Sequence, residues 1–311
     1  MPAADRRGVR RGQARAGRAA GEQVVAVGYL AAWRLVRLLP EPAAQRVFAR
    51  VADQLVRRDG RGVARLRSNL RRLRPDLDEA GLDRLTHAAA RSYLRYWCEL
   101  FRLPSWPLPD LVARTRTEAE HHLRDAYAAG GGAVVALPHM ANWDWAGAWA
   151  CATGMPLATV AERLRPERLY DRFVAYRATL GMRILPLTGG APSLPRLEEW
   201  VRSGGLVCLL ADRDLSRTGV EVELCGARAR VPRGPAVLAL RTGAPLVPVT
   251  LHYEGAEMVL AFHPPVPPVD GPAGPQAMMQ GVADAFTEGL RAHPQDWHMM
   301  QRVFVDEPPG P

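Results

Sequence analysis

His139 is the side chain of this sequence best placed to act as a base. It follows the apolar segment Gly130-Gly-Gly-Ala-Val-Val-Ala-Leu-Pro and precedes a helix for which Asn142 is the expected N-cap. Asp144 would lie in the first turn of that helix, within reach of the imidazole. A carboxylate on one ring nitrogen fixes the tautomer and leaves the other nitrogen to accept a proton. The pair therefore predicts general-base chemistry beside helix N–H groups that can hold an oxyanion, although the spacing alone also permits purely structural roles.

Other common kinds of functional site are disfavoured. His139 has no His or Cys neighbour at ligand spacing, so no metal is expected. Ser193 and Ser216 lack the G-x-S-x-G elbow of serine hydrolases. The chain has no lysine and hence no P-loop, and Gly130–Gly132 precede their strand, opposite to a dinucleotide fingerprint. We therefore expect neither a metal nor a bound cofactor.

Strands and helices alternate through the central and C-terminal parts of the chain. We expect strands at 133–137, 157–161, 182–187, 206–211, 246–253 and 258–263, and helices at 142–151, 167–180, 193–203, 235–241 and 276–292. This alternation predicts an α/β fold with a mainly parallel central sheet and helices on both faces. Ligands of such sheets bind beyond the carboxyl ends of the strands, which is where His139 lies.

The N-terminal third is basic, and its periodicity is helical. We expect helices at 23–39, 43–58, 62–73 and 79–103. The apolar run from Val24 to Trp33 falls well short of the roughly 20 residues that a spanning helix needs, so no transmembrane helix is expected. Between Arg46 and Arg74, ten arginines face two acids, and the whole chain carries a net charge of +9. This imbalance favours an anionic surface as partner and predicts a membrane-associating helical region.

We interpret the chain as one folded domain with two tails. Residues 1–21 form a disordered basic tail, and residues 307–311 form a short C-terminal one. The single domain covers 22–306, with a helical, membrane-facing part at 22–104 and an α/β catalytic core at 105–306. The four cysteines lack metal-type spacing and suit a reducing compartment. The expected location is therefore peripheral, at the cytoplasmic face of the plasma membrane.

Several blocks of the sequence resemble the glycerolipid acyltransferase superfamily. The His-x4-Asp box formed by His139 and Asp144 is its signature. More closely, the chain resembles the lysophospholipid-type acyltransferases that include the late acyltransferases of lipid A synthesis. That resemblance is carried by Val160-Ala-Glu162-Arg-Leu-Arg-Pro-Glu, Phe173-Val-Ala-Tyr-Arg177 and Leu210-Ala-Asp212-Arg-Asp214-Leu-Ser. The last block is most similar to that of actinobacterial phosphatidylinositol mannoside acyltransferases.

The resemblance implies a definite reaction. A long-chain acyl group, such as palmitoyl, would pass from acyl-CoA to a mannose hydroxyl of a phosphatidylinositol mannoside, a glycolipid acceptor. His139 would be the general base and Asp144 its support, without a covalent acyl-enzyme. Other side chains would line the same cleft and bind substrate: Glu162, Arg177, Asp212 and Asp214. The resemblance leaves open which of the last two faces the site.

Alternatives remain open at this point. The acceptor could be a lysophospholipid or a lipid A-type precursor, and the donor an acyl-carrier protein. The arginines also suit nucleic acid, but no zinc, RNA-recognition or helix-turn-helix signature is present. The apolar run beside the arginines suits a lipid interface better, so no nucleic acid is expected. Acyl-chain length, the hydroxyl acylated and the oligomeric state are not determined by the sequence.

Overall fold

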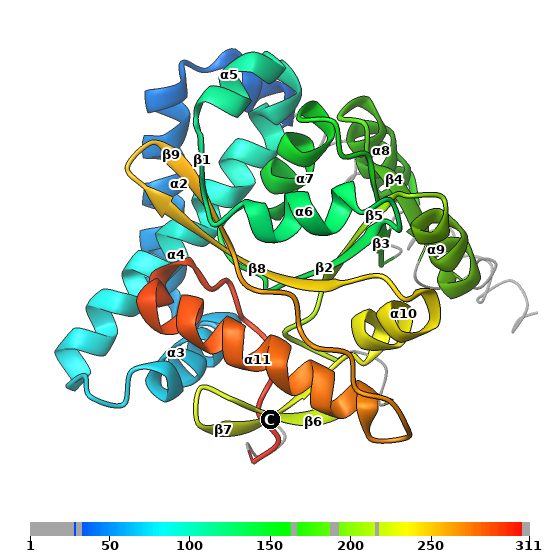
Figure 1. Cartoon of the computed structure of the whole chain (residues 1–311). Coiled ribbons are helices and arrows are strands. Elements are labelled where there is room, and N and C mark those ends of the chain that lie inside the picture. Colours follow the sequence, from blue (N-terminus) through cyan, green and yellow to red (C-terminus); the bar gives the residue numbers. More distant parts are fainter. Residues whose placement is uncertain (1–27, 29–32, 163–166, 187–192, 215–217, 307–311) are drawn as a thin grey trace, which may run out of the picture.

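The computed structural model of the chain describes residues 28, 33–162, 167–186, 193–214 and 218–306. Its centre is a seven-stranded sheet in the order β1-β9-β8-β2-β5-β3-β4 (Figure 1). The strands are β1 Thr115–Glu118, β2 Ala133–Leu137, β3 Leu157–Ala161, β4 Arg183–Pro186, β5 Leu206–Leu210, β8 Leu246–Glu254 and β9 Glu257–Phe262. Neighbours run parallel except for the hairpin of β8 and β9. The predicted mainly parallel sheet is confirmed.

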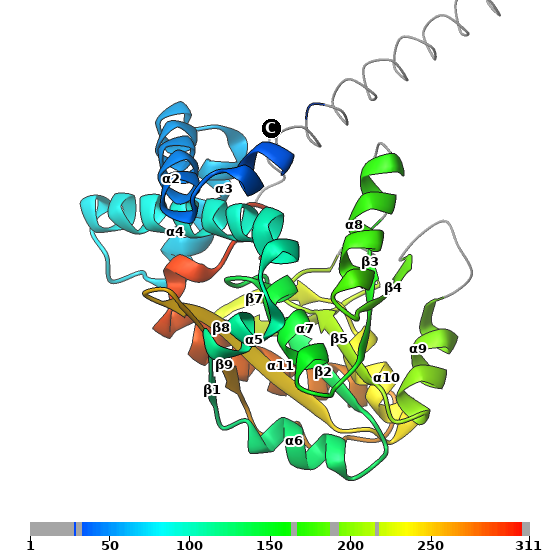
Figure 2. The same ribbon diagram turned by 90° about the horizontal axis from the view of Figure 1, so that it is seen from above.

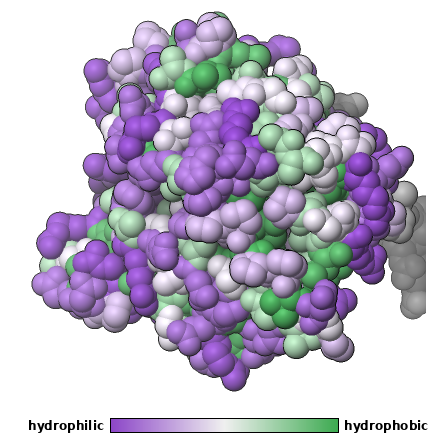
Figure 3. Space-filling view, in the orientation of Figure 1, coloured by the Kyte–Doolittle hydropathy of each residue, from purple (hydrophilic) through white to green (hydrophobic). Residues whose placement is uncertain are grey.

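Helices cover both faces of this sheet, as the alternating pattern predicts (Figures 1 and 2). One face carries α6 His121–Ala128, α7 Trp143–Ala152 and α8 Glu167–Thr179. The other carries α9 Ser193–Arg202, α10 Gly234–Thr242 and α11 Gly274–Ala292. Because both faces are covered, β2 is buried at every residue and reads as a continuous apolar run. The surface in Figure 3 is mainly hydrophilic, with small separate apolar areas.

The N-terminal helices pack together at one end of the sheet (Figure 2). They are α2 Glu41–Arg58, α3 Arg61–Leu73 and α4 Glu79–Arg102, followed by the short helices η1 Leu103–Ser105 and α5 Leu108–Ala113. Asp78 caps α4 by accepting a hydrogen bond from the N–H of Gly81 at 2.7 Å. In the described part of the chain, no helix is both long and apolar enough to span a bilayer.

The helix expected at 23–39 lies mostly outside the described residues, and its end from Trp33 onward is helical. Trp33 fixes this end to the core. Its side chain is buried, its Nε1–H donates to the carbonyl of Phe101 at 2.8 Å, and its ring lies 5.3 Å from that of Phe173. The side chain of Trp33 therefore contacts both α4 and α8.

The segment between residues 211 and 235, in which we expected no strand or helix, contains a hairpin. Its strands are β6 Val220–Leu224 and β7 Ala227–Val231, and they pair antiparallel. Cys225 and Gly226 at the turn both have positive φ, 56° and 82°, as a tight hairpin turn requires. The alternation in Val-Glu-Val-Glu-Leu and Ala-Arg-Ala-Arg-Val is the period-two signal of a strand. The elements β1, α5 and α6 were also absent from the prediction.

The close packing of α11 on β8 leads to a stability prediction. A Cβ at Gly289 would lie 2.6 Å from Cβ of Thr250, which is too close for any real contact. Gly289→Ala should therefore lower the free energy of unfolding by about 1–3 kcal/mol through overpacking. This cost exceeds the gain of about 1 kcal/mol in helix propensity.

The matched control is Gly62→Ala in α3. A Cβ there meets its nearest atom, in Met300, at 3.7 Å, so the variant should be neutral or stabilised by up to about 1 kcal/mol. Urea unfolding of both variants measures the difference. A Gly289→Ala protein as stable as Gly62→Ala would contradict the packing described here.

Candidate functional site

His139 lies at the carboxyl edge of the sheet, in the loop that joins β2 to α7. The loop is held from the C-terminal segment by backbone hydrogen bonds. The N–H of His298 donates to the carbonyl of His139 at 2.8 Å, and the N–H of Ala141 donates to the carbonyl of Asp296 at 2.9 Å. Ala141 has a φ of 42°, which is costly for a residue with a Cβ. Packing of the C-terminal segment thus holds His139 in a backbone turn that the loop would not adopt alone.

The carboxylate that binds the His139 ring is Asp212. It follows β5, the parallel neighbour of β2, so both residues leave the sheet at the same edge. Asp212 Oδ1 lies 2.6 Å from Nδ1 of His139. Asp212 Oδ2 accepts the backbone N–H of His139 and the indole N–H of Trp297, both at 2.9 Å. With Nδ1 donating to a carboxylate, Nε2 keeps its lone pair and can accept a proton.

Asp212 is fully buried, and its charge is maintained by its neighbours. Burial alone would raise the pKa of Asp212. The charge of His139 and the hydrogen bonds from His139 and Trp297 outweigh it and hold the pKa below its ordinary value. The carboxylate therefore stays ionised and can stabilise a positive charge on the imidazole during proton transfer.

The expected contact between His139 and Asp144 is not formed. Asp144 is the second residue of α7, and its side chain is directed at α8 and α4. Arg177 of α8 binds it through two hydrogen bonds, Nε to Oδ1 at 2.5 Å and Nη2 to Oδ2 at 3.1 Å. The hydroxyl of Tyr96 donates to Oδ2 at 3.1 Å. Burial would lower the pKa of Arg177, but the charge of Asp144 raises it above its ordinary value. Asp144 and Arg177 therefore form a nearly buried ion pair beside the His139 loop.

The other two predicted site residues are Glu162 and Asp214. Glu162 is exposed and directly follows β3. Asp214 Oδ2 accepts the N–H of Gly219 at 3.1 Å, and the N–H of Asp214 donates to the carbonyl of Arg230 on β7. Asp214 thus holds the connection to the β6–β7 hairpin. Of the two acids left open by the sequence, Asp212 is the one at the imidazole.

His298 is a neighbour of His139 that the sequence did not single out. Its Nε2 lies 2.9 Å from the hydroxyl oxygen of Ser92, and that hydroxyl donates to Asp296 at 2.6 Å. Its Nδ1 is buried and has no hydrogen-bond partner among the described residues. Burial, and then the charge of His139, lower the pKa of His298 to about 3, so the ring is neutral at physiological pH. With Nε2 donating to Ser92, Nδ1 is a hydrogen-bond acceptor that still lacks a donor.

An apolar cavity of about 80 Å³ lies between α7 and the sheet, next to the Asp144–Arg177 pair. Its wall comes from α6, α7, α8 and five strands, and its charged members are Asp144 and Arg177. The apolar members include Leu123, Trp143, Trp149, Met182, Leu210 and Phe262. Trp143 also flanks His139, with ring centroids 5.4 Å apart. The lining suits alkyl groups, but the volume is below the roughly 300–1,000 Å³ of usual ligand pockets, so a long acyl chain would fit only if the cavity widened.

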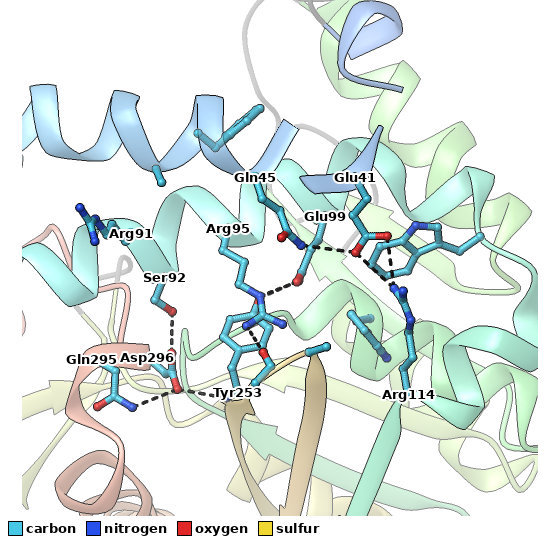
Figure 4. A pocket seen from close by; sticks show the side chains of 16 residues that line it. Glu41, Gln45, Arg91, Ser92, Arg95, Glu99, Arg114, Tyr253, Gln295 and Asp296 are labelled. Atoms are coloured by element: carbon cyan, nitrogen blue, oxygen red, sulfur yellow. Dashed lines mark hydrogen bonds and ion pairs between the residues drawn. The ribbon is translucent and has the colours of Figure 1, made fainter. Parts of the chain in front are cut away.

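A larger, polar cavity of about 550 Å³ lies between α2, α4 and the β8–β9 turn (Figure 4). In it, Glu99 of α4 accepts a hydrogen bond from the hydroxyl of Tyr253 at 2.7 Å. The same oxygen accepts from the amide of Asn142 at 3.0 Å. This second bond orients Asn142 so that its Oδ1 caps α7 by accepting the N–H of Trp145 at 3.0 Å. Glu99, which lines this cavity, thus supports the start of α7, the helix that follows His139.

Comparison with known proteins identifies the family of the chain. The family model described as bacterial lipid A biosynthesis acyltransferase matches residues 19–305. A phosphatidylinositol mannoside acyltransferase from Mycolicibacterium smegmatis is 44% identical over 288 residues, which is 92% of this chain and 93% of the relative. A protein of the same name from Mycobacterium tuberculosis is 44% identical over 280 residues, 89% of this chain and 87% of the relative.

A match over almost the whole chain, together with relatives at this identity, fixes the family. The resemblance of the sequence to the lipid A type of acyltransferase, and to phosphatidylinositol mannoside acyltransferases, is thereby confirmed. The chain is an acyltransferase that belongs to the bacterial lipid A biosynthesis acyltransferase family.

Proposed function

We propose that this acyltransferase transfers a long-chain acyl group, such as palmitoyl, from acyl-CoA to a mannose hydroxyl of a phosphatidylinositol mannoside. The observation that carries the proposed chemistry is the His139–Asp212 pair at 2.6 Å, placed beside an apolar cavity. The proposed acceptor rests on the relatives, which bear the name phosphatidylinositol mannoside acyltransferase at 44% identity. Lysophospholipid or a lipid A-type precursor is the alternative acceptor.

In the proposed mechanism, Nε2 of His139 removes the proton of the acceptor hydroxyl as its oxygen attacks the thioester carbonyl. Asp212, fixed on Nδ1, stabilises the imidazolium that results. The tetrahedral intermediate then collapses, the carbon–sulfur bond breaks and an ester bond remains. The imidazolium returns the proton to the departing thiolate, so that free CoA leaves and His139 is neutral again. No covalent acyl-enzyme is formed.

The start of α7 is the proposed oxyanion site. The first N–H groups of a helix have no intrahelical acceptor and carry its positive dipole end. In α7 these belong to Trp143 and Asp144, four and five residues after His139. They can donate to the oxygen that becomes negative in the tetrahedral intermediate. In this proposal Asp144 is a positioning residue, because it connects this helix start to Arg177 and Tyr96.

Polar groups around His139 support a sugar as acceptor. Nδ1 of His298 is a buried acceptor for which the described residues provide no donor, and a hydroxyl next to the reacting one would supply it. Nε of Arg213, one residue after Asp212, is also buried, has no hydrogen-bond partner within the described part of the chain, and suits a phosphate oxygen. A phosphatidylinositol mannoside carries both kinds of group. A lysophospholipid offers the phosphate with fewer hydroxyls.

A membrane-facing surface is proposed for the N-terminal helices. Val47, Val51 and Leu55 recur every four residues on α2, and their exposed fractions are 46%, 45% and 36%. Leu35 and Leu38 are exposed by 60% and 81%. We define Val47, Val51 and Leu55 as the α2 apolar face. It suits the acyl region of a bilayer, and neighbouring arginines such as Arg46 and Arg50 suit anionic headgroups. Residues 22–104 would then face the membrane peripherally at its cytoplasmic side, and 105–306 would carry the chemistry.

The arginines of α3 are less suited to that role than the sequence indicated. Arg67 binds Asp83 and Glu79 of α4, and Arg71 also binds Glu79. Because these ion pairs neutralise Arg67 and Arg71, the two guanidinium groups are less available to bind lipid headgroups. The proposed contact therefore centres on α2 and residues 33–38.

Substitutions at the two carboxylates separate their roles. His139→Ala should reduce transfer from palmitoyl-CoA by about 10²–10⁴-fold, because the base is lost. Asp212→Asn should cause a loss of similar order, because the imidazole loses its tautomer and its counter-charge. Asp144→Asn should retain more activity than either, but should lower the free energy of unfolding by about 3–5 kcal/mol because Arg177 loses its buried partner.

These effects are measured by single-turnover transfer assays and by thermal unfolding of each variant. His139→Gln serves as the control that keeps a polar side chain without the base. An Asp212→Asn enzyme with wild-type turnover, or an Asp144→Asn enzyme as stable as wild type but inactive, would refute this division of roles.

The acceptor is tested by direct competition. A mannosylated phosphatidylinositol and a lysophospholipid are mixed at equal concentration with palmitoyl-CoA, and the products are identified by mass spectrometry. We expect the mannoside to be acylated preferentially, and His298→Ala to reduce that preference by removing the free acceptor at Nδ1. Preferential acylation of the lysophospholipid would overturn the acceptor assignment and leave the role of His139 standing.

Vesicle binding tests the α2 apolar face. The triple variant Val47→Ser, Val51→Ser, Leu55→Ser should bind anionic vesicles more weakly than wild type, since each buried apolar side chain contributes about 1.5–3 kcal/mol. Arg46→Gln with Arg50→Gln should weaken binding to anionic vesicles and leave binding to neutral ones almost unchanged. The control is Leu108→Ser, an exposed apolar residue on α5. Equal sedimentation of the triple variant and this control would exclude α2 as the contact.

A further inference from the structure

A second group of titratable side chains lies on strands β1 and β8 of the sheet. It consists of Glu118 at the end of β1 and of His252 and Glu254 on β8. One ligand atom of each residue lies within 4.8 Å of the other two. β1 and β8 both pair with β9, and the register places Arg116 and His252 opposite the same residue, Val259. The three side chains therefore project from one face of the sheet.

The donor set is that of a transition-metal site. One imidazole and two carboxylates are common ligands of zinc. His252 Nε2 and Glu254 Oε1 are 3.3 Å apart. That separation matches the edge of a tetrahedron whose ligand bonds are about 2.0–2.1 Å long. An ion could therefore bind both atoms with little movement of either.

Burial and packing suit such a site. The side chain of His252 is 5% exposed and that of Glu254 is 50% exposed, so the imidazole is fixed while the carboxylate side is open to an entering ion. The ring of His293 stacks on that of His252 with centroids 3.5 Å apart and planes 7° apart.

We propose that Glu118, His252 and Glu254 form a binding site for zinc or a similar divalent transition-metal ion, with water completing the coordination. The ion would join β1 to β8 across β9. Tyr253, between two of the ligands, points to the opposite face and donates to Glu99. The site thus lies on the sheet face opposite to the side chain of Tyr253, which supports Asn142 through Glu99. It shares no residue with the catalytic pair.

Arg116 is the competitor of this ion. Its guanidinium binds Glu118 at 2.8 Å and Glu254 at 2.7 Å, and so offsets one of their two negative charges in the absence of metal. Glu254 Oε1 is the atom that also faces His252. An ion that takes this oxygen must displace Arg116 from it. Removing the guanidinium should therefore strengthen metal binding, an effect opposite to that of removing a ligand.

Calorimetric titration of the full chain with zinc chloride at pH 7 tests the proposal, with magnesium chloride as the comparison ion. We expect one zinc ion per chain and no comparable magnesium binding. Glu118→Gln and Glu254→Gln should each weaken zinc binding by more than about tenfold, since even the loss of an outer-shell partner typically costs 10- to 100-fold. Arg116→Gln should tighten it. All three positions are largely exposed, so the variants should fold, and thermal unfolding without metal checks this.

Glu288→Gln is the charge-matched control. Glu288 is also an exposed carboxylate beside a histidine, His263, at 3.6 Å, but it lies outside the cluster. Zinc binding that is unaffected by this change and lost in the ligand variants supports the site. The absence of zinc binding, equal affinity in Glu118→Gln and wild type, or loss of binding in Glu288→Gln would overturn the proposal.

Discussion

The buried carboxylate of Asp212 is the constraint around which the site is built. An ionised carboxylate without water is stable only if its oxygens accept several hydrogen bonds. Asp212 has three such bonds, from the ring and backbone of His139 and from Trp297. These donors come from the end of β2 and from the C-terminal segment. Satisfying one buried charge therefore brings three distant parts of the chain to one point.

The same requirement explains how the loop after β2 keeps its shape. Trp297 is fully buried and Met140 forms a bridge with it, so the C-terminal segment lies directly on the loop. The backbone bonds from His298 and to Asp296 hold the positive φ of Ala141. The free energy that offsets this strain comes from the burial of Trp297 and from its bond to Asp212. Loss of the C-terminal segment would release the base as well as its counter-charge.

The sequence predicted those parts of the molecule in which the signal is local. The buried run Ala133–Leu137 and the period of α11 were both recognisable, because burial on two faces gives apolar runs and burial on one helix face gives a 3.6-residue period. The sequence of the β6–β7 hairpin alternates with a period of two, as strands do. We did not predict strands there because every second residue is charged. These charges are paired across the strands, as with Arg230 and Glu221 at 2.9 Å.

The partner of His139 could not be found in the same way, because it depends on strand order. Asp144 was the nearest acid in sequence, and its direction on α7 follows from where α4 and α8 pack. Asp212 becomes adjacent only because β5 is the sheet neighbour of β2. Parallel neighbours need a crossover, so the residue that meets a catalytic group is often far away in the chain. His298 was missed for the same reason, since only the fold of the C-terminal segment brings it near.

Three buried acids surround the start of α7, and each has a different partner. Asp212 binds the imidazole, Asp144 binds Arg177, and Glu99 binds Arg95 as well as Asn142. Asp144 and Glu99 are each paired with an arginine, and Asp212 is held by hydrogen bonds from the neutral imidazole and from Trp297, so the base does not share its proton with the other two acids. α4 supplies Tyr96 and Glu99 to this arrangement, and its opposite side packs on α2 through Ala52 and Ala90. Under the proposed function, one helix therefore connects the membrane-facing surface to the residues that orient the reacting groups.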